Sequence, residues 1–334
     1  MRIRLISPPI LTTLLGLAPA AHAHIGDQIY PFYELLDEDL HRIDLTDASV
    51  DDWLDVLGEP SLTAADFYYP YSSYDPTNCD NRFWLGWHRR SGTLWVAMER
   101  FDDIYHNNYA GEILESGLPT ISRPTMFRWD SYFSFMVDGD HSGGRYLFVA
   151  NNCEGCTVEE ITLLNNRQAQ HWLAIAETTD GQHLGYDGAS EWAVREPYAA
   201  AGGGVLGATP ATTVTELKVT PFDDLIYDDE AASAASELYP GKVIGFNLYT
   251  IDNDATEFSD GMGPLDSQWL SDKCIPSASP IVVDGLLVGA GEDPSRYDDV
   301  SSVEPSSWDG SRPPSSRPPR RKGGAPCVPA SSPF

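Results

Sequence analysis

Two alternating apolar segments joined by a short turn constrain the fold of this chain more than any other feature. The segments are Arg82–Trp87 and Thr93–Phe101, and the turn between them ends in Ser91-Gly92. Alternation at period two is typical of half-buried strands, and a glycine-bearing loop of about five residues fits a hairpin. The second segment leads into Asp102-Asp103, an acidic pair that can hold a cation or a hydroxylated ligand. A hairpin this rich in tryptophan favours a ligand-binding β-sandwich over a catalytic α/β fold.

Further segments with strand-like patterning follow along the chain. We expect strands at Arg128–Val137, Gln168–Glu177, Thr213–Thr220, Lys242–Ile251 and Pro280–Val288. The Gly/Ala-rich residues Ala199–Gly207 are expected to form a loop. Short helical turns are expected at Ala48–Leu57, with Asp47 or Ser49 as N-cap, and near Ala231–Leu238. Successive strands with loops of variable length predict an all-β chain, folded as an antiparallel β-sandwich with long loops and a few helical turns.

The N-terminal residues have the pattern of an export signal. Arg2 and Arg4 precede the apolar run Ile10–Ala18, and Ala21-His22-Ala23 provides an A-x-A cleavage pattern. The apolar run is too short to span a bilayer. We therefore predict a signal peptide at residues 1–23, cleaved near Ala23. The mature protein is expected to be secreted, displayed at the cell surface or periplasmic, without membrane insertion.

The composition changes at Ser301. We expect residues 24–300 to form one β-sandwich domain, whereas residues 301–334 are rich in Pro and Ser and almost free of aliphatic side chains. Such a segment cannot bury a core, which predicts a disordered tail. Beyond Asp309 the tail carries basic residues and no acidic one.

The net charge limits the kinds of molecule that this protein can bind. The formal net charge is −29 at pH 7, and the sequence pI is about 4.3. This excess of acid argues against nucleic acid and anionic membranes as partners. It suits a saline medium or calcium binding, and it also simply keeps a protein soluble.

Five cysteines fit the disulfides of an exported chain. Cys153 and Cys156 can close on each other, or one of them can pair with Cys79 or Cys274. Cys327 in the tail is expected to lack a partner within the chain. A zinc knuckle would need a second C-x-x-C pair, which the sequence does not contain.

Five elements, in order between Asp47 and Leu287, resemble the family 9 carbohydrate-binding modules. They are a D-x-x-W-like element at Asp51-Asp52-Trp53, the strand Leu94–Ala97 leading to Asp102-Asp103, the segment Trp129–Asp138, the segment Thr215–Leu225, and Gly241–Asn247 followed by Asp252-Asn253-Asp254. The resemblance implies a non-catalytic β-sandwich that binds poly- or oligosaccharide.

The resemblance also implies a site. In that family two tryptophans clamp a terminal sugar, and the matching positions here are Trp129 and Trp269. The C–H groups on the two faces of a pyranose ring stack on indole rings, while polar groups satisfy the hydroxyls. Gln170 stands where the family often has a polar sugar contact, but Ser134 replaces a glutamate. Trp192 is a third aromatic candidate, and the hairpin tryptophans are expected to pack in the core.

Two acidic loops are candidate calcium sites. Asp138 and Asp140 are followed by glycines, and Asp252 and Asp254 repeat the D-x-D spacing. Carboxylates and free carbonyls on one tight loop suit a hard cation such as calcium, used here in a structural role. The same pattern also fits an ordinary Asp-Gly turn between strands, and neither loop has the distal glutamate of an EF-hand.

No G-x-S-x-G, H-E-x-x-H or P-loop motif is present. One alternative is a structural or adhesion module without sugar binding. A second resembles the copper lytic polysaccharide monooxygenases, in which cleavage would leave His24 as the N-terminus beside one of His88, His106, His141, His171 or His183. A third, a haem sandwich of the DOMON type, would use Met98, Met126, Met136 or Met262, but C-x-x-C-H is absent.

Overall fold

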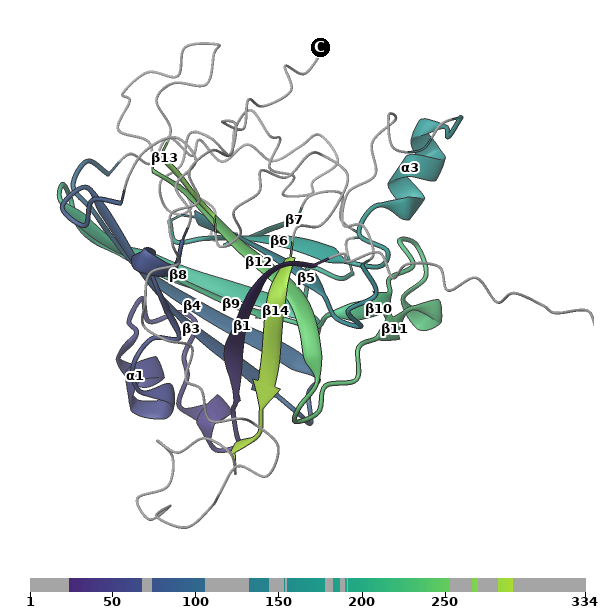
Figure 1. Cartoon of the computed structure of the whole chain (residues 1–334), viewed down its shortest axis with the longest axis horizontal. Coiled ribbons are helices and arrows are strands. Elements are labelled where there is room, and N and C mark those ends of the chain that lie inside the picture. Colours follow the sequence, from purple (N-terminus) through teal and green to yellow (C-terminus); the bar gives the residue numbers. More distant parts are fainter. Residues whose placement is uncertain are drawn as a thin grey trace, which may run out of the picture.

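A computed structural model describes residues 24–67, 74–105, 132–143, 153, 155–177, 183–186, 190, 192–252, 266–269 and 282–290. Within them, twelve strands form one sheet and two form another (Figure 1). The strands are β1 (His24–Glu34), β2 (Leu62–Thr63), β3 (Cys79–His88), β4 (Thr93–Asp102), β5 (Tyr132–Asp138), β6 (Gln170–Ile175), β7 (Leu184–Tyr186), β8 (Ala199–Gly207), β9 (Ala211–Val219), β10 (Phe222–Asp224), β11 (Ala234–Ala235), β12 (Val243–Asp252), β13 (Asp266–Trp269) and β14 (Val282–Val288).

The helical elements are short. They are α1 (Asp51–Leu57), α3 (Val158–Leu164) and the 3-10 turns η1 (Asp39–His41), η2 (Ala64–Asp66) and η4 (Glu230–Ala232). Among the described residues, no helix has the length and apolar content needed to cross a bilayer. The predicted signal peptide and the predicted tail both lie outside the described residues.

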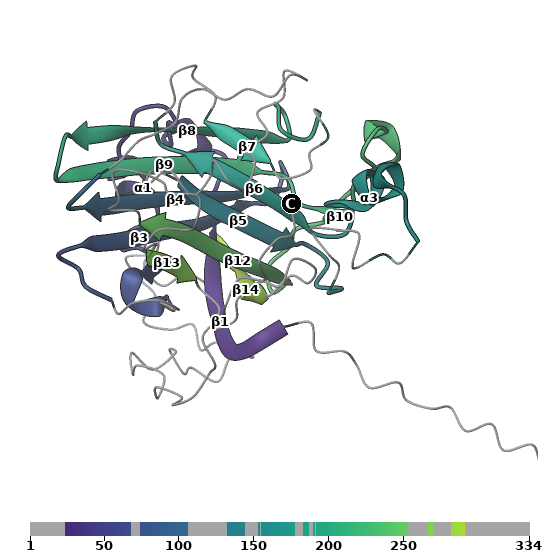
Figure 2. The same ribbon diagram turned by 90° about the horizontal axis from the view of Figure 1, so that it is seen from above.

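The main sheet bends over on itself. Its strands follow the order β7-β6-β5-β12-β14-β1-β3-β4-β9-β8, with β13 beside β12 and β2 beside β3. Side chains from the two halves of this order meet: the rings of Phe83 in β3 and Phe133 in β5 pack edge to face with centroids 5.8 Å apart. Strands β6 and β7 also contact β8, so the two far edges approach each other. The bend falls at β1 and β14, which run side by side in Figures 1 and 2. The chain is therefore the β-sandwich that the sequence predicts.

The sheet is mixed, whereas the sequence analysis expected a purely antiparallel one. Strand β1 runs parallel to β14, with Tyr33 opposite Val288, and parallel to β3, with Tyr33 opposite Gly86. The other strand pairs of the described chain are antiparallel. No hairpin joins β1 to either neighbour, so the short turn that imposes an antiparallel direction is missing.

The main core lies between the two layers, and its side chains follow the period of two. Phe133, Phe135 and Val137 of β5 belong to it, as do Phe246 and Leu248 of β12. Each fully buried side chain of this size contributes roughly 1.5–3 kcal/mol to stability. The alternation that predicted the strands is thus the alternation between the core and the outer face of a layer.

The predicted hairpin is confirmed. Strands β3 and β4 pair without a break from Cys79 opposite Asp102 to His88 opposite Thr93. Trp84 and Trp87 are fully buried, and Trp95 is nearly so. The Trp87 indole donates to the Val288 carbonyl at 2.9 Å. These tryptophans are packing residues, as expected. The other predicted strands correspond to β5, β6, β9, β12 and β14.

The outer face of β3, β4 and β9 is covered by residues 35–58, which include α1. Trp53 of α1 is fully buried in a second apolar cluster with Trp84 and Trp95, its ring 6.5 Å from that of Trp95. This side of the sandwich therefore has its own small core, outside the main one.

The cap predicted for this helix is wrong. Helix α1 starts at Asp51, and its N-cap is Val50, which makes no side-chain capping bond. The Ser49 hydroxyl instead accepts from the Asp51 N–H at 3.1 Å, and Asp47 Oδ1 accepts from the Ser49 N–H at 2.9 Å. Both predicted caps therefore order the turn that precedes the helix. The helical turn expected near residues 231–238 is η4.

The segment Ala199–Gly207, predicted as a loop, is strand β8, paired along its length with β9. The glycines of β8 leave room for residues 45–48, which cross over this strand. A Cβ atom on Gly202 would lie 1.8 Å from the Leu45 carbonyl oxygen, and one on Gly204 would lie 2.5 Å from Ala48 Cβ. Residues 45–48 consequently rest directly on β8, because this strand has no side chains there.

Among the predicted disulfides, the pair Cys153–Cys156 is present. Cys79 is buried at the start of β3, and Cys274 and Cys327 lie outside the described residues.

Replacing Gly202 by alanine should push residues 45–48 off the sheet, because the new methyl group would overlap a backbone carbonyl. We expect a loss of more than about 2 kcal/mol in the free energy of unfolding, measured by urea denaturation. Gly86→Ala is the matched control: its Cβ would meet only the Leu35 side chain, at 3.1 Å, and that side chain can shift. Equal losses in the two variants would contradict this account of β8.

Candidate functional site

The predicted sugar-binding residues fall into two groups along β5. Trp269 ends β13 and pairs with Tyr249 of β12, which in turn pairs with Ser134 of β5. Trp129 lies outside the described residues, three positions before Tyr132, the first residue of β5. Trp269 therefore lies in the part of the sheet where β5 begins, which we call the Tyr132 end.

Gln170 lies toward the other end of β5, opposite Val137. Its side chain is fully buried. The amide Nε2 donates to the carbonyls of Asn166 and Phe222, both at 3.0 Å, and Oε1 accepts from the Phe222 N–H at 2.8 Å. The predicted role of Gln170 as a sugar contact does not fit this structure, because its amide is hydrogen-bonded to backbone and ties β6 to β10.

Trp192 belongs with Gln170 rather than with Trp269. Its ring packs edge-on against Phe222, with centroids 5.4 Å apart, and against Tyr198 at 5.1 Å. The indole N–H donates to the Tyr227 carbonyl at 3.2 Å. The half-buried ring is thus held in a small apolar cluster, and the three described candidates do not converge on one site.

The predicted calcium loop after β5 is a tight turn. The carboxylate of buried Asp138 accepts from the N–H groups of Ser142 at 3.1 Å and Gly143 at 2.7 Å. Asp140 accepts from the same Ser142 N–H at 3.1 Å. Burial and the neighbouring Asp140 raise the pKa of Asp138 to about 7. The backbone amides hold these carboxylates, and calcium binding at this loop stays a prediction.

The second predicted calcium residue already has a positive partner. Buried Asp252 lies 3.3 Å from the guanidinium of Arg100, which also contacts Asp102 at 3.0 Å. Arg100 itself is fully buried. The positive charge beside Asp102 and Asp252 is therefore an arginine, and calcium binding at Asp252 stays a prediction. Asp254 lies outside the described residues.

A groove of about 540 Å³ opens where β1 ends beside the β3–β4 turn, and it carries several charged side chains. These charges pair with one another. Arg89 contacts Glu34 at 2.9 Å, and Arg90 contacts Asp37 at 2.7 Å. Asp37 also lies 3.2 Å from the imidazole of His88. Because these contacts balance the charges within the groove, it offers little to attract a charged ligand.

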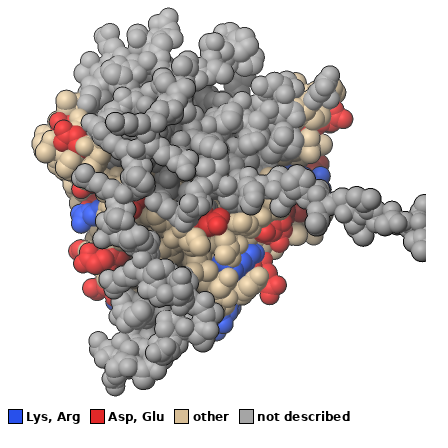
Figure 3. Space-filling view, in the orientation of Figure 1, with Lys and Arg blue, Asp and Glu red and all other residues tan. Residues whose placement is uncertain are grey.

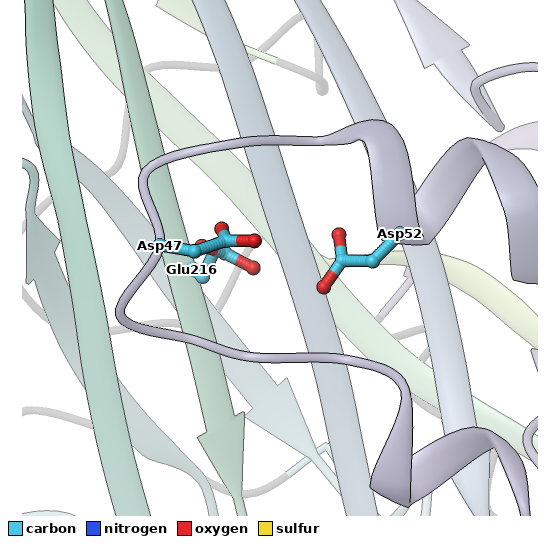
Figure 4. A group of neighbouring side chains, drawn as sticks. All are labelled: Asp47, Asp52 and Glu216. Carbon is cyan, nitrogen blue, oxygen red and sulfur yellow. The ribbon is translucent and has the colours of Figure 1, made fainter.

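Three carboxylates that the sequence analysis did not group converge on the outer face of the other layer. Asp47 comes from the loop before α1, Asp52 from α1, and Glu216 from β9. One oxygen of each lies within 4.8 Å of the others. Figure 4 shows Asp47 and Asp52 pointing toward each other, with Glu216 beside Asp47.

The electrostatics of this cluster are unusual. Burial, together with the nearby Asp52, Asp47 and Asp44, raises the pKa of Glu216 to about 8. Burial also raises the pKa of Asp52. Within the described part of the chain, none of the three carboxylates forms a salt bridge with lysine or arginine. Glu216 occupies an outward position of its strand, where sequence alone predicts exposure.

The side chains of four described histidines have partners within the protein. His88 contacts Ser91 and Asp37, and His141 contacts Asp284. His171 contacts Ser134, and His183 contacts the Ile175 carbonyl. His24 begins β1, and His106 lies outside the described residues. Met98 and Met136 are buried, and Met126 and Met262 are likewise outside. These contacts do not support the copper or haem alternatives.

Comparison with known proteins gives matches among solved structures. A family 9 carbohydrate-binding module from Caldicellulosiruptor kristjanssonii in complex with glucose is 12% identical, with a TM-score of 0.43, over 81% of this chain and 100% of the module. A family 9 module from the same organism in complex with cellotriose is 12% identical, with a TM-score of 0.42, over 82% of this chain and 98% of that module. A Bacteroides uniformis protein described as carbohydrate-binding is 9% identical, with a TM-score of 0.42, over 78% and 99%.

No family model matches the sequence, and no curated protein matches it. Two of the three solved structures belong to the family that the sequence motifs resemble. The likeness concerns the fold alone, and the sandwich itself is established by the strand order and core of this chain.

Replacing Arg100 by methionine should leave Asp102 and Asp252 buried without the guanidinium that now lies between them. Breaking a buried ion pair by removing one partner typically costs roughly 3–5 kcal/mol, and we expect a loss of this size in urea denaturation. Arg82→Met is the control, because Arg82 is half exposed and contacts Glu99 at the surface, where ion pairs contribute about 0–1 kcal/mol. A loss below about 1 kcal/mol for Arg100→Met would contradict this role.

Proposed function

We propose that this chain is an exported, non-catalytic carbohydrate-binding protein that holds a sugar between Trp129 and Trp269. The order of the five sequence elements supports the proposal, since it resembles that of a sugar-binding family. The absence of recognisable catalytic motifs from the sequence is consistent with a binding role.

The observation that carries the proposal is the register of β13, β12 and β5. Trp269, Tyr249 and Ser134 stand in one row across these strands. Two inter-strand spacings separate Trp269 from Ser134, a distance of about 10 Å between backbones. Three residues of chain can carry Trp129 at most about 11 Å from Tyr132. The position of Trp269 in this layer and the short stretch of sequence between Trp129 and β5 support a role for both tryptophans in one site for a small ligand.

The chemistry of stacking suits this pair. Each face of a pyranose presents C–H groups that pack on an indole ring, and such contacts contribute roughly 0.5–1.5 kcal/mol beyond the area they bury. One or two stacked sugars would then give a Kd in the micromolar to millimolar range. Gln170 and Trp192 are left out of this site, since both are engaged in packing β6 and β10.

The alternative is a structural or adhesion module of a cell surface. The half-buried ring of Trp192 and the charge-paired groove near Arg89 are consistent with a scaffold, and neither points to a ligand. A screen in which no carbohydrate binds would favour this alternative.

Trp129→Ala and Trp269→Ala should each weaken sugar binding at least about tenfold, since each removes one stacking face. A glycan array that includes glucose and cello-oligosaccharides would identify the ligand, and isothermal titration would give the affinities. The melting temperature should change little. Trp192→Ala is the control and should lower stability while leaving affinity unchanged. If either of the first two variants instead unfolds, its indole belongs to the core and the proposed clamp is wrong.

Export makes a separate prediction. If the first 23 residues are removed on secretion, the intact mass of the protein recovered outside the cytoplasm should correspond to a chain that begins at His24. A mass that retains residues 1–23 would contradict this proposal.

A further inference from the structure

Two acidic clusters in the described part of the chain, each with a buried carboxylate, differ in their partners. Asp102 and Asp252 share the guanidinium of Arg100. The cluster of Asp47, Asp52 and Glu216 has no such group in the described structure. Gathering three carboxylates without a counter-charge is costly, because each disfavours ionisation of the others.

One atom of the cluster points to a missing ligand. Glu216 is fully buried, and its Oε1 accepts from the Trp53 indole N–H at 2.5 Å. Its Oε2 is also buried and has no hydrogen-bond partner in the described structure. A buried acceptor left without a donor destabilises the folded state, and more so if it is charged. This carboxylate is directed toward Asp47 and Asp52, as Figure 4 shows.

The other two carboxylates are held by backbone N–H groups. Asp52 Oδ2 accepts from the Asp44 N–H and Asp52 Oδ1 from the Trp53 N–H, both at 2.8 Å. Asp47 Oδ1 accepts from the Ser49 N–H at 2.9 Å. These bonds fix the directions of the carboxylates before any ligand arrives, which is the pre-organisation expected of a binding site.

The sheet beneath the cluster is built from small residues. Glu216 is flanked by Ala97 of β4 and Gly202 of β8. Because neither neighbour has a large side chain, residues 45–48 lie directly on β8 and shield Glu216 from water. Exposure rises from buried Glu216 through Asp52 to exposed Asp47. The cluster is therefore closed toward the sheet and open toward solvent at Asp47.

We propose that Asp47, Asp52 and Glu216 bind one calcium ion, which fastens the covering segment 35–58 to β9. Three carboxylates form an all-oxygen donor set, which suits a hard cation and not a soft metal that prefers thiolate. Calcium bonds oxygen at about 2.3–2.6 Å, so oxygens up to about 5 Å apart can share one ion. Magnesium bonds oxygen at about 2.0–2.1 Å in a strict octahedron. Its ligand oxygens must therefore lie closer together than the spacing of up to 4.8 Å in this cluster.

The test uses the full chain, freed of metal with EGTA and passed into metal-free buffer. Adding calcium chloride alone should raise the melting temperature by about 5 °C at a concentration near 100 times the Kd. Magnesium chloride at the same concentration should raise it less. Isothermal titration with calcium should show binding that the variants below remove.

Glu216→Gln and Asp47→Asn should each abolish the rise in melting temperature caused by calcium. Glutamine can still accept from Trp53, so Glu216→Gln should be at least as stable as the parent protein when metal is absent. Asp51→Asn is the matched control, because Asp51 is an exposed carboxylate in the first turn of the same helix. It should keep the full response. Asp47→Asn supplies a second, exposed position should the buried substitution prevent folding.

Four results would overturn the proposal. The first is that the melting temperature of the parent protein does not respond to calcium, and the second is that Glu216→Gln or Asp47→Asn keeps the full response. The third is that Glu216→Gln is destabilised equally with and without calcium. The fourth is that Asp140→Asn loses the response. The last would place the ion at the loop after β5. Trp269→Ala should keep the calcium response, so failure of the sugar proposal and failure of this one can be told apart.

Discussion

The architecture depends on β1, a strand that belongs to both layers of the sandwich. It is hydrogen-bonded to β14 on one side and to β3 on the other, both in parallel. Its Phe32 packs edge-on against Phe246 of β12, with ring centroids 4.9 Å apart. Because the main sheet bends at this strand, the layer of β5, β6 and β12 faces the layer of β3, β4 and β9 across one apolar core.

This acidic protein holds negative charge in its interior at two places, one between the two layers and one beneath the segment that covers β9. Figure 3 shows acidic side chains along both sides of one view, with basic ones among them. At the surface, water and salt screen such charges. In the interior they need a partner, and Arg100 provides one for Asp102 and Asp252. Among the described residues, Glu216 has no such partner: it is a buried carboxylate beside other acids, and its pKa is raised. A cation from solvent would neutralise the charge of Glu216, as Arg100 neutralises the charges of Asp102 and Asp252.

The sequence predicted the elements whose period is visible in the side chains. The hairpin of β3 and β4 and the strands β5, β6, β9, β12 and β14 all alternate, and each was expected close to its observed position. Strand β8 was missed because the residues at 199–204 are alanine and glycine, which have no alternating apolar pattern. Small residues are needed here because residues 45–48 pack directly on this strand. This is a tertiary contact, which a local sequence pattern cannot show.

The candidate sites show the same limit. An outward carboxylate such as Glu216 reads as a solvent-exposed residue of an amphipathic strand. Only the folding of residues 35–58 over β9 makes it buried. Gln170 was assigned to a sugar from its place in a motif, yet its amide bonds to the backbone of β10. The D-x-D pattern at Asp252 could not reveal that Arg100, 152 residues away, supplies the charge.

The two proposed sites lie on different layers, and we therefore infer different roles for them, one in binding sugar and one in stability. Trp269 and the start of β5 belong to the layer of β12, whereas Glu216 belongs to β9 in the facing layer. A calcium ion at Glu216 therefore cannot contact a sugar held by Trp269. Its effect would be to fix residues 35–58, and with them Trp53, on the outside of β3, β4 and β9. Because β3 and β4 also line the main core, a firmly held cover stabilises the layer against which β5 and β12 pack. The metal would thus support the binding layer through the shared core, as a structural ion.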